Sequence, residues 1–125
     1  MNAPSQHEIA ARAHERAADL HDAARLILSA MISAEGDEDL TQLAISSAQL
    51  AFIHSKTAYA ASLAINDGLR YGGHYDKCVD AASAALYEAE ASTEIPENDP
   101  EAQDRNRAAA TSHRYAARCH NRRRG

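Results

Sequence analysis

Residues 7–34 read HEIAARAHERAADLHDAARLILSAMISA, and a histidine followed by an acidic residue recurs in them every seven residues, at His7, His14 and His21. Small and apolar residues recur beside these doublets in alternating steps of three and four, the spacing of helices that pack along their length. We predict a helix over 7–34, with the histidines one position beside this packed stripe. The stripe comprises Ala10, Ala13, Ala17, Leu20, Ala24, Ile27, Met31 and Ala34.

Residues that typically begin or end helices predict three more helices further along the chain. The acidic run 35–39 suits the cap and first turn of a second helix, over 38–67, and Gly68 suits its C-terminus. A third helix is expected over 74–91. Pro100, which suits a first helical turn, begins a fourth over 100–121.

The second of these helices differs from the rest because it is apolar nearly all round. Between residues 40 and 66 the only charge is Lys56. A helix of this kind is expected to be surrounded by the others, although its polar residues argue against a bilayer span. Its predicted inward stripe is Leu40, Ala44, Ser47, Ala51, His54, Ala58, Ala61 and Ile65.

Composition favours a thin, all-helical core. Alanine supplies 29 of the 125 residues, and Leu, Ile, Val and Phe together supply 18, about 14 percent. Alanine is the best helix former, so we predict an all-α fold, either a four-helix bundle or an array of helical hairpins, with the second helix central. The length allows one domain: a disordered N-terminus (1–6), a helical domain (7–121) and a basic C-terminal tail (122–125).

Charge is distributed unevenly along the chain. Residues 1–104 hold 6 basic and 18 acidic side chains, whereas residues 105–125 hold seven arginines and no acid. These arginines suit phosphate binding, or they pair with protein acids such as those at 88–104 or 35–39. A third interpretation is a solvated tail without a binding role, and all three stay open. The arginines are Arg105, Arg107, Arg114, Arg118, Arg122, Arg123 and Arg124.

Four polar residues fall on faces that the periodicity places inside: His54, Asn106, His113 and His120. Buried polar groups need hydrogen-bond partners. We therefore expect these four to bond across the core and to set the register of an otherwise uniform alanine packing.

We predict no metal site and no cofactor. Successive histidines in 7–21 are about 10.5 Å apart on a helix, too far to share one ion. The alternative is a zinc site, with His74 and Cys78 four residues apart on one helical face and Cys119 as a third ligand if the last two helices pack together. His120 is expected to point about 100° away from Cys119.

Enzymatic motifs are scarce in this sequence. It has no Gly-x-Gly-x-x-Gly, P-loop, Cys-x-x-Cys or His-Glu-x-x-His. The alternative of a metal- or His-dependent hydrolase or a helical HEPN ribonuclease rests on Arg107 and His113, which fit Arg-x(4–6)-His. That spacing also occurs at Arg16/His21 and Arg114/His120, so it does not discriminate. We predict that the protein is not an enzyme.

Part of the chain resembles a known repeat. Ile65 and Leu69 fall where a tetratricopeptide hairpin has bulky residues, Gly73-His74-Tyr75 matches its turn, and Ala82 and Ala85 follow. Residues 62–89 thus resemble one tetratricopeptide-like hairpin, which implies a helical protein-binding scaffold. Ser62 and Asn66 depart from the pattern, and no closing proline follows Ala85. The whole chain resembles small helical proteins of actinobacteria and their phages, which implies no activity.

These observations converge on a non-enzymatic helical module for protein–protein interaction or assembly, one that self-associates or binds another protein. The alternative is a nucleic-acid-associated protein that binds phosphates through residues 105–125. No secretory signal is recognisable, and two cysteines do not form a disulfide framework, so we expect a cytoplasmic protein without a membrane partner.

Overall fold

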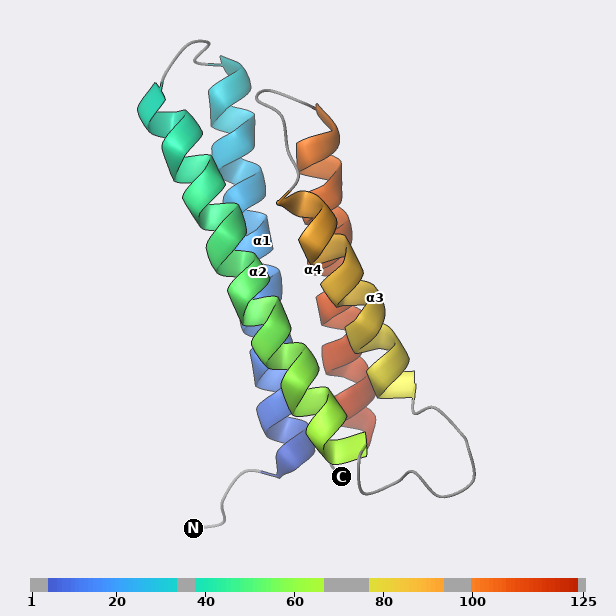
Figure 1. Cartoon of the computed structure of the whole chain (residues 1–125). Coiled ribbons are helices and arrows are strands. Elements are labelled where there is room, and N and C mark those ends of the chain that lie inside the picture. The colour runs from blue at the N-terminus through green and yellow to red at the C-terminus, as the bar shows by residue number, and fades with distance from the viewer. Residues whose placement is uncertain (1–4, 34–37, 67–76, 94–99, 124–125) are drawn as a thin grey trace.

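Four helices pack in an up-down-up-down bundle in this computed structural model (Figure 1). They are α1 (Gln6–Ser33), α2 (Glu38–Asn66), α3 (Lys77–Ser92) and α4 (Pro100–Arg123). The structure describes residues 5–33, 38–66, 77–93 and 100–123. α1 packs mainly against α2 and α4, and α3 packs against the same two helices. The predicted all-α, four-helix arrangement is therefore confirmed.

Local signals explain where the described helices begin and end. The Ser5 hydroxyl accepts a hydrogen bond from the backbone N–H of Glu8, at 3.1 Å, and so caps α1. The expected disorder of residues 1–6 is thus wrong for residues 5 and 6, while 1–4 lie outside the described residues. α4 begins at Pro100 and continues through Arg123, so residues 122 and 123 of the expected tail are helical, while 124–125 lie outside the described residues. None of the described helices is both long and apolar enough to cross a bilayer.

The core is built from small apolar side chains and large polar ones. Among the described residues, its apolar members are mostly alanines, joined by Leu28, Val79 and two cysteines. The largest fully buried side chains are instead His14, His21, His113 and His120. Imidazole rings therefore fill the volume that leucine or phenylalanine occupies in an ordinary bundle.

The packed face of α1 shares every second residue with the predicted stripe, and the residues between them are shifted by one position. Ala10, Ala17 and Ala24 are buried as expected, but His14, His21 and Leu28 replace Ala13, Leu20 and Ile27 at the intervening positions. Both patterns alternate steps of three and four. The histidines are inside because they find hydrogen-bond partners there, which a single sequence stripe does not show.

The expectation that the second helix is surrounded by the others is wrong. α2 packs mainly against two neighbours, α1 and α3. Among its residues 42–65, whose side chains are described, the buried ones are all small: Ala44, Ala48, Ala51, Ser55, Ala58 and Ser62. Its bulky residues Leu43, Ile45, Leu50 and Ile53 are exposed. Close approach to a core filled by imidazole rings admits only small side chains on this helix, so the large ones turn outward.

Candidate functional site

Eight polar side chains form a hydrogen-bonded network along the centre of the bundle, here called the histidine network. α1, α2 and α4 contribute its members, and on each helix successive members are seven residues apart, or two helical turns. The network comprises His7, His14, His21, Ser55, Ser62, Asn106, His113 and His120.

Three layers of the network join α1 to α4. Nδ1 of His7 lies 2.9 Å from Nδ1 of His120, and Nδ1 of His14 lies 2.8 Å from Nδ1 of His113. In the third layer, Nδ1 of His21 lies 2.9 Å from Oδ1 of Asn106. Because α1 and α4 are antiparallel, the two sets of positions advance in opposite directions and stay in register over all three layers.

Two serines of α2 join one layer to the next. The Ser62 hydroxyl oxygen lies 3.0 Å from Nε2 of His14 and 2.8 Å from Nε2 of His120. The Ser55 oxygen lies 2.7 Å from Nε2 of His113 and 3.2 Å from Nε2 of His21. The layers thus become one continuous chain of hydrogen bonds.

The direction of hydrogen-bond donation can be worked out from the Asn106 end of the network. Asn106 Oδ1 can only accept, so the Nδ1–H of His21 donates to it. Ser55 has one hydroxyl proton, which it donates to the carbonyl of Ala51, at 2.9 Å. Nε2 of His21, which carries no proton, is the second acceptor of the same hydroxyl. Ser55 must then accept from the Nε2–H of His113, whose Nδ1 accepts from His14.

Because a neutral imidazole donates through one nitrogen and accepts through the other, the remaining hydrogen bonds up to His7 are assigned in the same way. Nε2 of His14 accepts from Ser62, Ser62 accepts from the Nε2–H of His120, and Nδ1 of His120 accepts from the Nδ1–H of His7. The rings of His14, His21, His113 and His120 then each donate through one nitrogen and accept through the other, as neutral imidazoles do.

The electrostatics agree with neutral imidazoles. Burial, reinforced by His120, lowers the pKa of His14 from 6.5 to about 3. Burial also lowers the pKa of His113 to about 3, with His14 and His21 adding to the effect. The pKa of His21 is lowered by burial too, although its bond to Asn106 opposes the shift. A second proton on Nδ1 of His113 would also face the Nδ1–H of His14, which donates to it.

The predicted buried polar residues have different outcomes. Asn106, His113 and His120 are buried members of the network. His54 is half-buried and is not a member, because the adjacent Ser55 takes the inward position on α2. The sequence reasoning missed the two serines. The shared signal was their separation of seven residues, which matches the spacing of the histidines on the other two helices.

The end of the network nearest the start of α1 contains a cysteine. One ring nitrogen each from His7 and His120 and the Sγ of Cys78 all lie within 4.8 Å of one another. Cys119, the third member of the zinc alternative, packs with Cys78, Ala81 and Ala116, whereas His74 lies outside the described residues. The sequence analysis did not predict that His7 and His120 would lie beside Cys78.

Several of the C-terminal arginines pair with acids. Arg114 bonds Asp22 and Asp19 of α1, and Asp22 raises the pKa of Arg114. Within α4, Arg105 pairs with Glu101 and Arg107 with Asp104. Of the expected acidic partners, Glu101 and Asp104 are thus used, but α1 supplies the others, and 35–37 and 94–99 lie outside the described residues.

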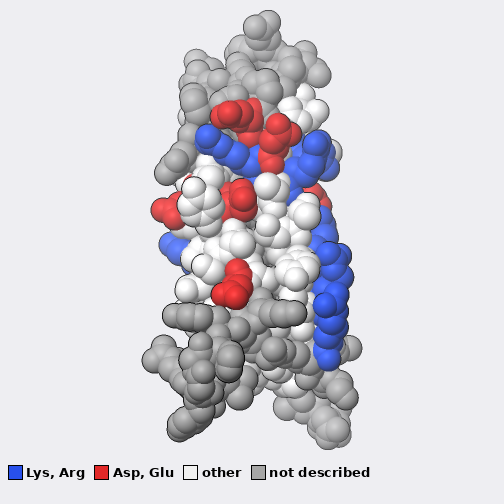
Figure 2. Space-filling view, turned by 90° about the vertical axis from the view of Figure 1, so that its right-hand side faces the viewer, with Lys and Arg blue, Asp and Glu red and all other residues white. Residues whose placement is uncertain are grey.

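The outer side of α4 remains basic. Arg118 and Arg122 are exposed, and Figure 2 shows Lys and Arg side chains in a column along one edge of this side of the molecule. Arg123 is helical, and Arg124 lies outside the described residues. The Arg-x(4–6)-His pair does not form a joint site, because Arg107 faces solvent while His113 is fully buried.

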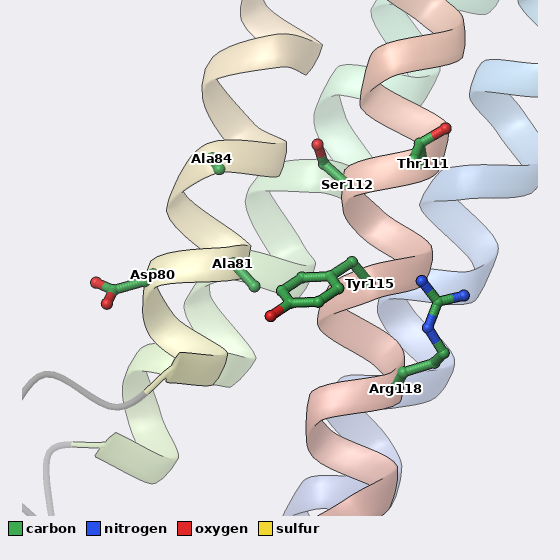
Figure 3. A pocket seen from close by; sticks show the side chains of 7 residues that line it. All are labelled: Asp80, Ala81, Ala84, Thr111, Ser112, Tyr115 and Arg118. Atoms are coloured by element: carbon green, nitrogen blue, oxygen red, sulfur yellow. The ribbon is translucent and has the colours of Figure 1, made fainter.

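A shallow groove of about 600 Å³ lies between α3 and α4. Tyr115 extends across it towards Ala81, while Asp80 points away from α4 and Arg118 lies on the other side of that helix (Figure 3). Since its charged groups do not converge, the groove offers no arrangement for acid–base chemistry.

Comparison of the chain with protein-family models, with curated proteins and with solved structures finds no match. The tetratricopeptide resemblance therefore receives no support from these comparisons, and the turn that carries its motif lies outside the described residues.

Proposed function

We propose that the protein is a non-enzymatic assembly module that associates with a second copy of itself through the outer face of α2. The observation that carries this proposal is the exposure of Leu43, Leu50 and Ile53, which are 50, 45 and 54 percent exposed. Their spacing of seven and three residues places them on one face of the helix, together with the exposed Ser46 and Thr57. Water contact of such an apolar stripe is unfavourable.

A second copy suits this face better than an unlike partner of opposite charge. In a two-fold contact each residue meets the same patch of its partner, so any charge in the patch would face its like. The stripe from Leu43 to Thr57 holds no charge, and Lys56 is the only charged residue between 40 and 66. The outer face of α4, with Arg118 and Arg122, would instead repel its copy.

The histidine network supports the same role from inside. Ser55 and Ser62 each bond two histidines, so they set the rotation of α2 about its axis. Rotation of α2 would break these bonds and would move Leu50 and Ile53 off the outer face. The polar core thereby determines which face is presented to the partner.

The test compares Leu50→Lys with a control, Leu26→Lys, because Leu26 is also an exposed leucine, 59 percent exposed against 45 percent for Leu50, but lies on α1. We expect sedimentation velocity to show a dimer for the unmodified chain and for Leu26→Lys, and a monomer for Leu50→Lys. Circular dichroism should show unchanged helicity in both variants. A monomeric unmodified chain at every concentration, or equal dissociation in both variants, would contradict the proposal.

A second candidate is phosphate binding by the outer side of α4, the nucleic-acid alternative. It is favoured by Arg107, Arg118 and Arg122, which are exposed on one side of the helix. Fluorescence anisotropy with generic DNA and RNA should then show binding that weakens steeply with salt. Arg118→Ala with Arg122→Ala should reduce it more than Arg114→Ala, since Arg114 is already paired with Asp22.

A further inference from the structure

α1 and α3 begin, and α4 ends, at the same end of the bundle (Figure 1), and three metal-ligating side chains come together there. A ring nitrogen of His7, the Sγ of Cys78 and a ring nitrogen of His120 lie within 4.8 Å of one another. Three different helices contribute them, so their convergence is a property of the packed bundle. Cys78 and His120 are buried and His7 is half-buried, which leaves one side of the cluster towards solvent.

We propose that His7, Cys78 and His120 bind one zinc-type ion, a divalent d-block cation that prefers thiolate and imidazole ligands. Zinc sites of three protein ligands keep a fourth, tetrahedral position for water or another ligand. Metal–ligand bonds of about 2.0–2.3 Å place tetrahedral ligand atoms roughly 3.3–3.8 Å apart. The Nδ1 atoms of His7 and His120 are 2.9 Å apart, so small side-chain rotations suffice.

The histidine network prepares His120 for this role. Its Nε2–H donates to Ser62, so its Nδ1 carries the lone pair, and Nδ1 is the atom that faces His7. Metal-bound histidines ordinarily donate their other N–H to an oxygen, which fixes the tautomer and the ring orientation. Ser62 is therefore a positioning residue of the proposed site.

Cys78 occupies a suitable place for a thiolate. It lies in the first turn of α3, which begins at Lys77, and the N-terminus of a helix favours negative charge. Cys78 is not disulfide-bonded, nor is Cys119.

Proton balance in the binding step is simple. Cys78 loses its thiol proton to solvent as the S–metal bond forms, so one proton is released for each ion bound. His7 moves its proton from Nδ1 to Nε2 by exchange with water at its solvent-facing side, and its Nδ1 lone pair then binds the ion. His120 keeps its proton on Nε2, and no change of oxidation state occurs.

Cobalt(II) titration of the full, reduced chain tests the site, because thiolate ligation of Co²⁺ gives a charge-transfer band in the near ultraviolet. We expect one Co²⁺ per chain with this band, and displacement of Co²⁺ by Zn²⁺. Cys78→Ser should abolish the band, whereas the matched control Cys119→Ser should retain it. His7→Gln should weaken Co²⁺ binding beyond the roughly 10–100-fold expected for Ser62→Ala, which removes an outer partner only.

Two results would overturn the proposal: a wild-type chain that binds Co²⁺ without the thiolate band or not at all, and a band that Cys119→Ser removes while Cys78→Ser does not. Circular dichroism of each metal-free variant separates loss of a ligand from loss of the fold. His7→Gln changes a half-buried residue at the start of α1, so it remains informative if Cys78→Ser unfolds.

Discussion

The two faces of α2 are the reverse of an ordinary amphipathic helix. Its inner face carries alanines together with Ser55 and Ser62, whereas its outer face carries Leu43, Leu50 and Ile53. The outer surface of α1 is mixed, with Arg12, Glu15 and Asp19 exposed beside Ile9 and Leu26. Side-chain size and hydrogen bonding, rather than hydrophobicity, decide what α2 buries.

The reason lies in the rings across from α2. His14, His21, His113 and His120 are all fully buried, and stacked pairs such as His14 with His120 have centroids 5.8 Å apart. Rings of this size leave little room on the facing helix, and their Nε2 atoms need oxygen partners. Serine meets both requirements, so the inner face of α2 is small and polar, and its outer apolar face is left for another molecule.

Of the perturbations considered, acid is expected to destabilise the buried histidine network most. His14 and His113 have a pKa of about 3 in the folded chain against 6.5 ordinarily, so unfolding binds protons between these values. The free energy of unfolding should therefore fall as pH falls through this window, by no more than about 3 kcal/mol per pH unit for two protons. Urea titrations at neutral and mildly acidic pH measure this, and a constant stability would contradict the buried, neutral network.

Truncation of one ring is the next largest perturbation. His113→Ala removes a buried ring and leaves the partners His14 and Ser55 short of a hydrogen bond each. We expect a loss of about 3–5 kcal/mol in the free energy of unfolding. His54→Ala is the matched control, since His54 is half-buried next to Ser55, and equal losses in both variants would refute the distinction between the two positions.

Removal of a single hydroxyl should be milder. Ser62→Ala deletes the group that joins His14 to His120, and we expect a loss of about 1–3 kcal/mol in chemical denaturation. Ser46→Ala on the outer face should change stability by less than about 0.5 kcal/mol. A Ser62→Ala chain as stable as the unmodified one would show that the hydroxyl is dispensable.

Polar contacts on the outside should contribute least. Arg114→Ala removes the ion pairs with Asp19 and Asp22, but the Arg114 side chain is 41 percent exposed. We expect a loss of no more than about 1 kcal/mol, and a smaller one at high salt. Thermal unfolding at two salt concentrations measures it, and a loss as large as that of His113→Ala would contradict the contrast between inside and outside.

Much of the fold was predictable because its signals are local. Pro100 and the alternation of apolar steps place helices within a few residues of where they lie, and the inner face of α4, from Asn106 to His120, follows directly from its period. On α1 the periodicity alone does not distinguish a stripe through Ala13 from one through His14. Polarity favoured the wrong choice, because the energetic cost of burying an imidazole depends on partners in other helices.

The sequence by itself determined four alanine-rich helices, a concentration of arginine in the last one, and the seven-residue repeat of histidine. Only the tertiary structure decided that the repeats of α1 and α4 meet layer by layer, that Ser55 and Ser62 join them, and that His7, Cys78 and His120 converge. Helix periodicity is a short-range property of the backbone. Which imidazole faces which hydroxyl depends on how antiparallel helices slide and rotate against one another, and packing together with the satisfaction of buried polar groups sets that arrangement.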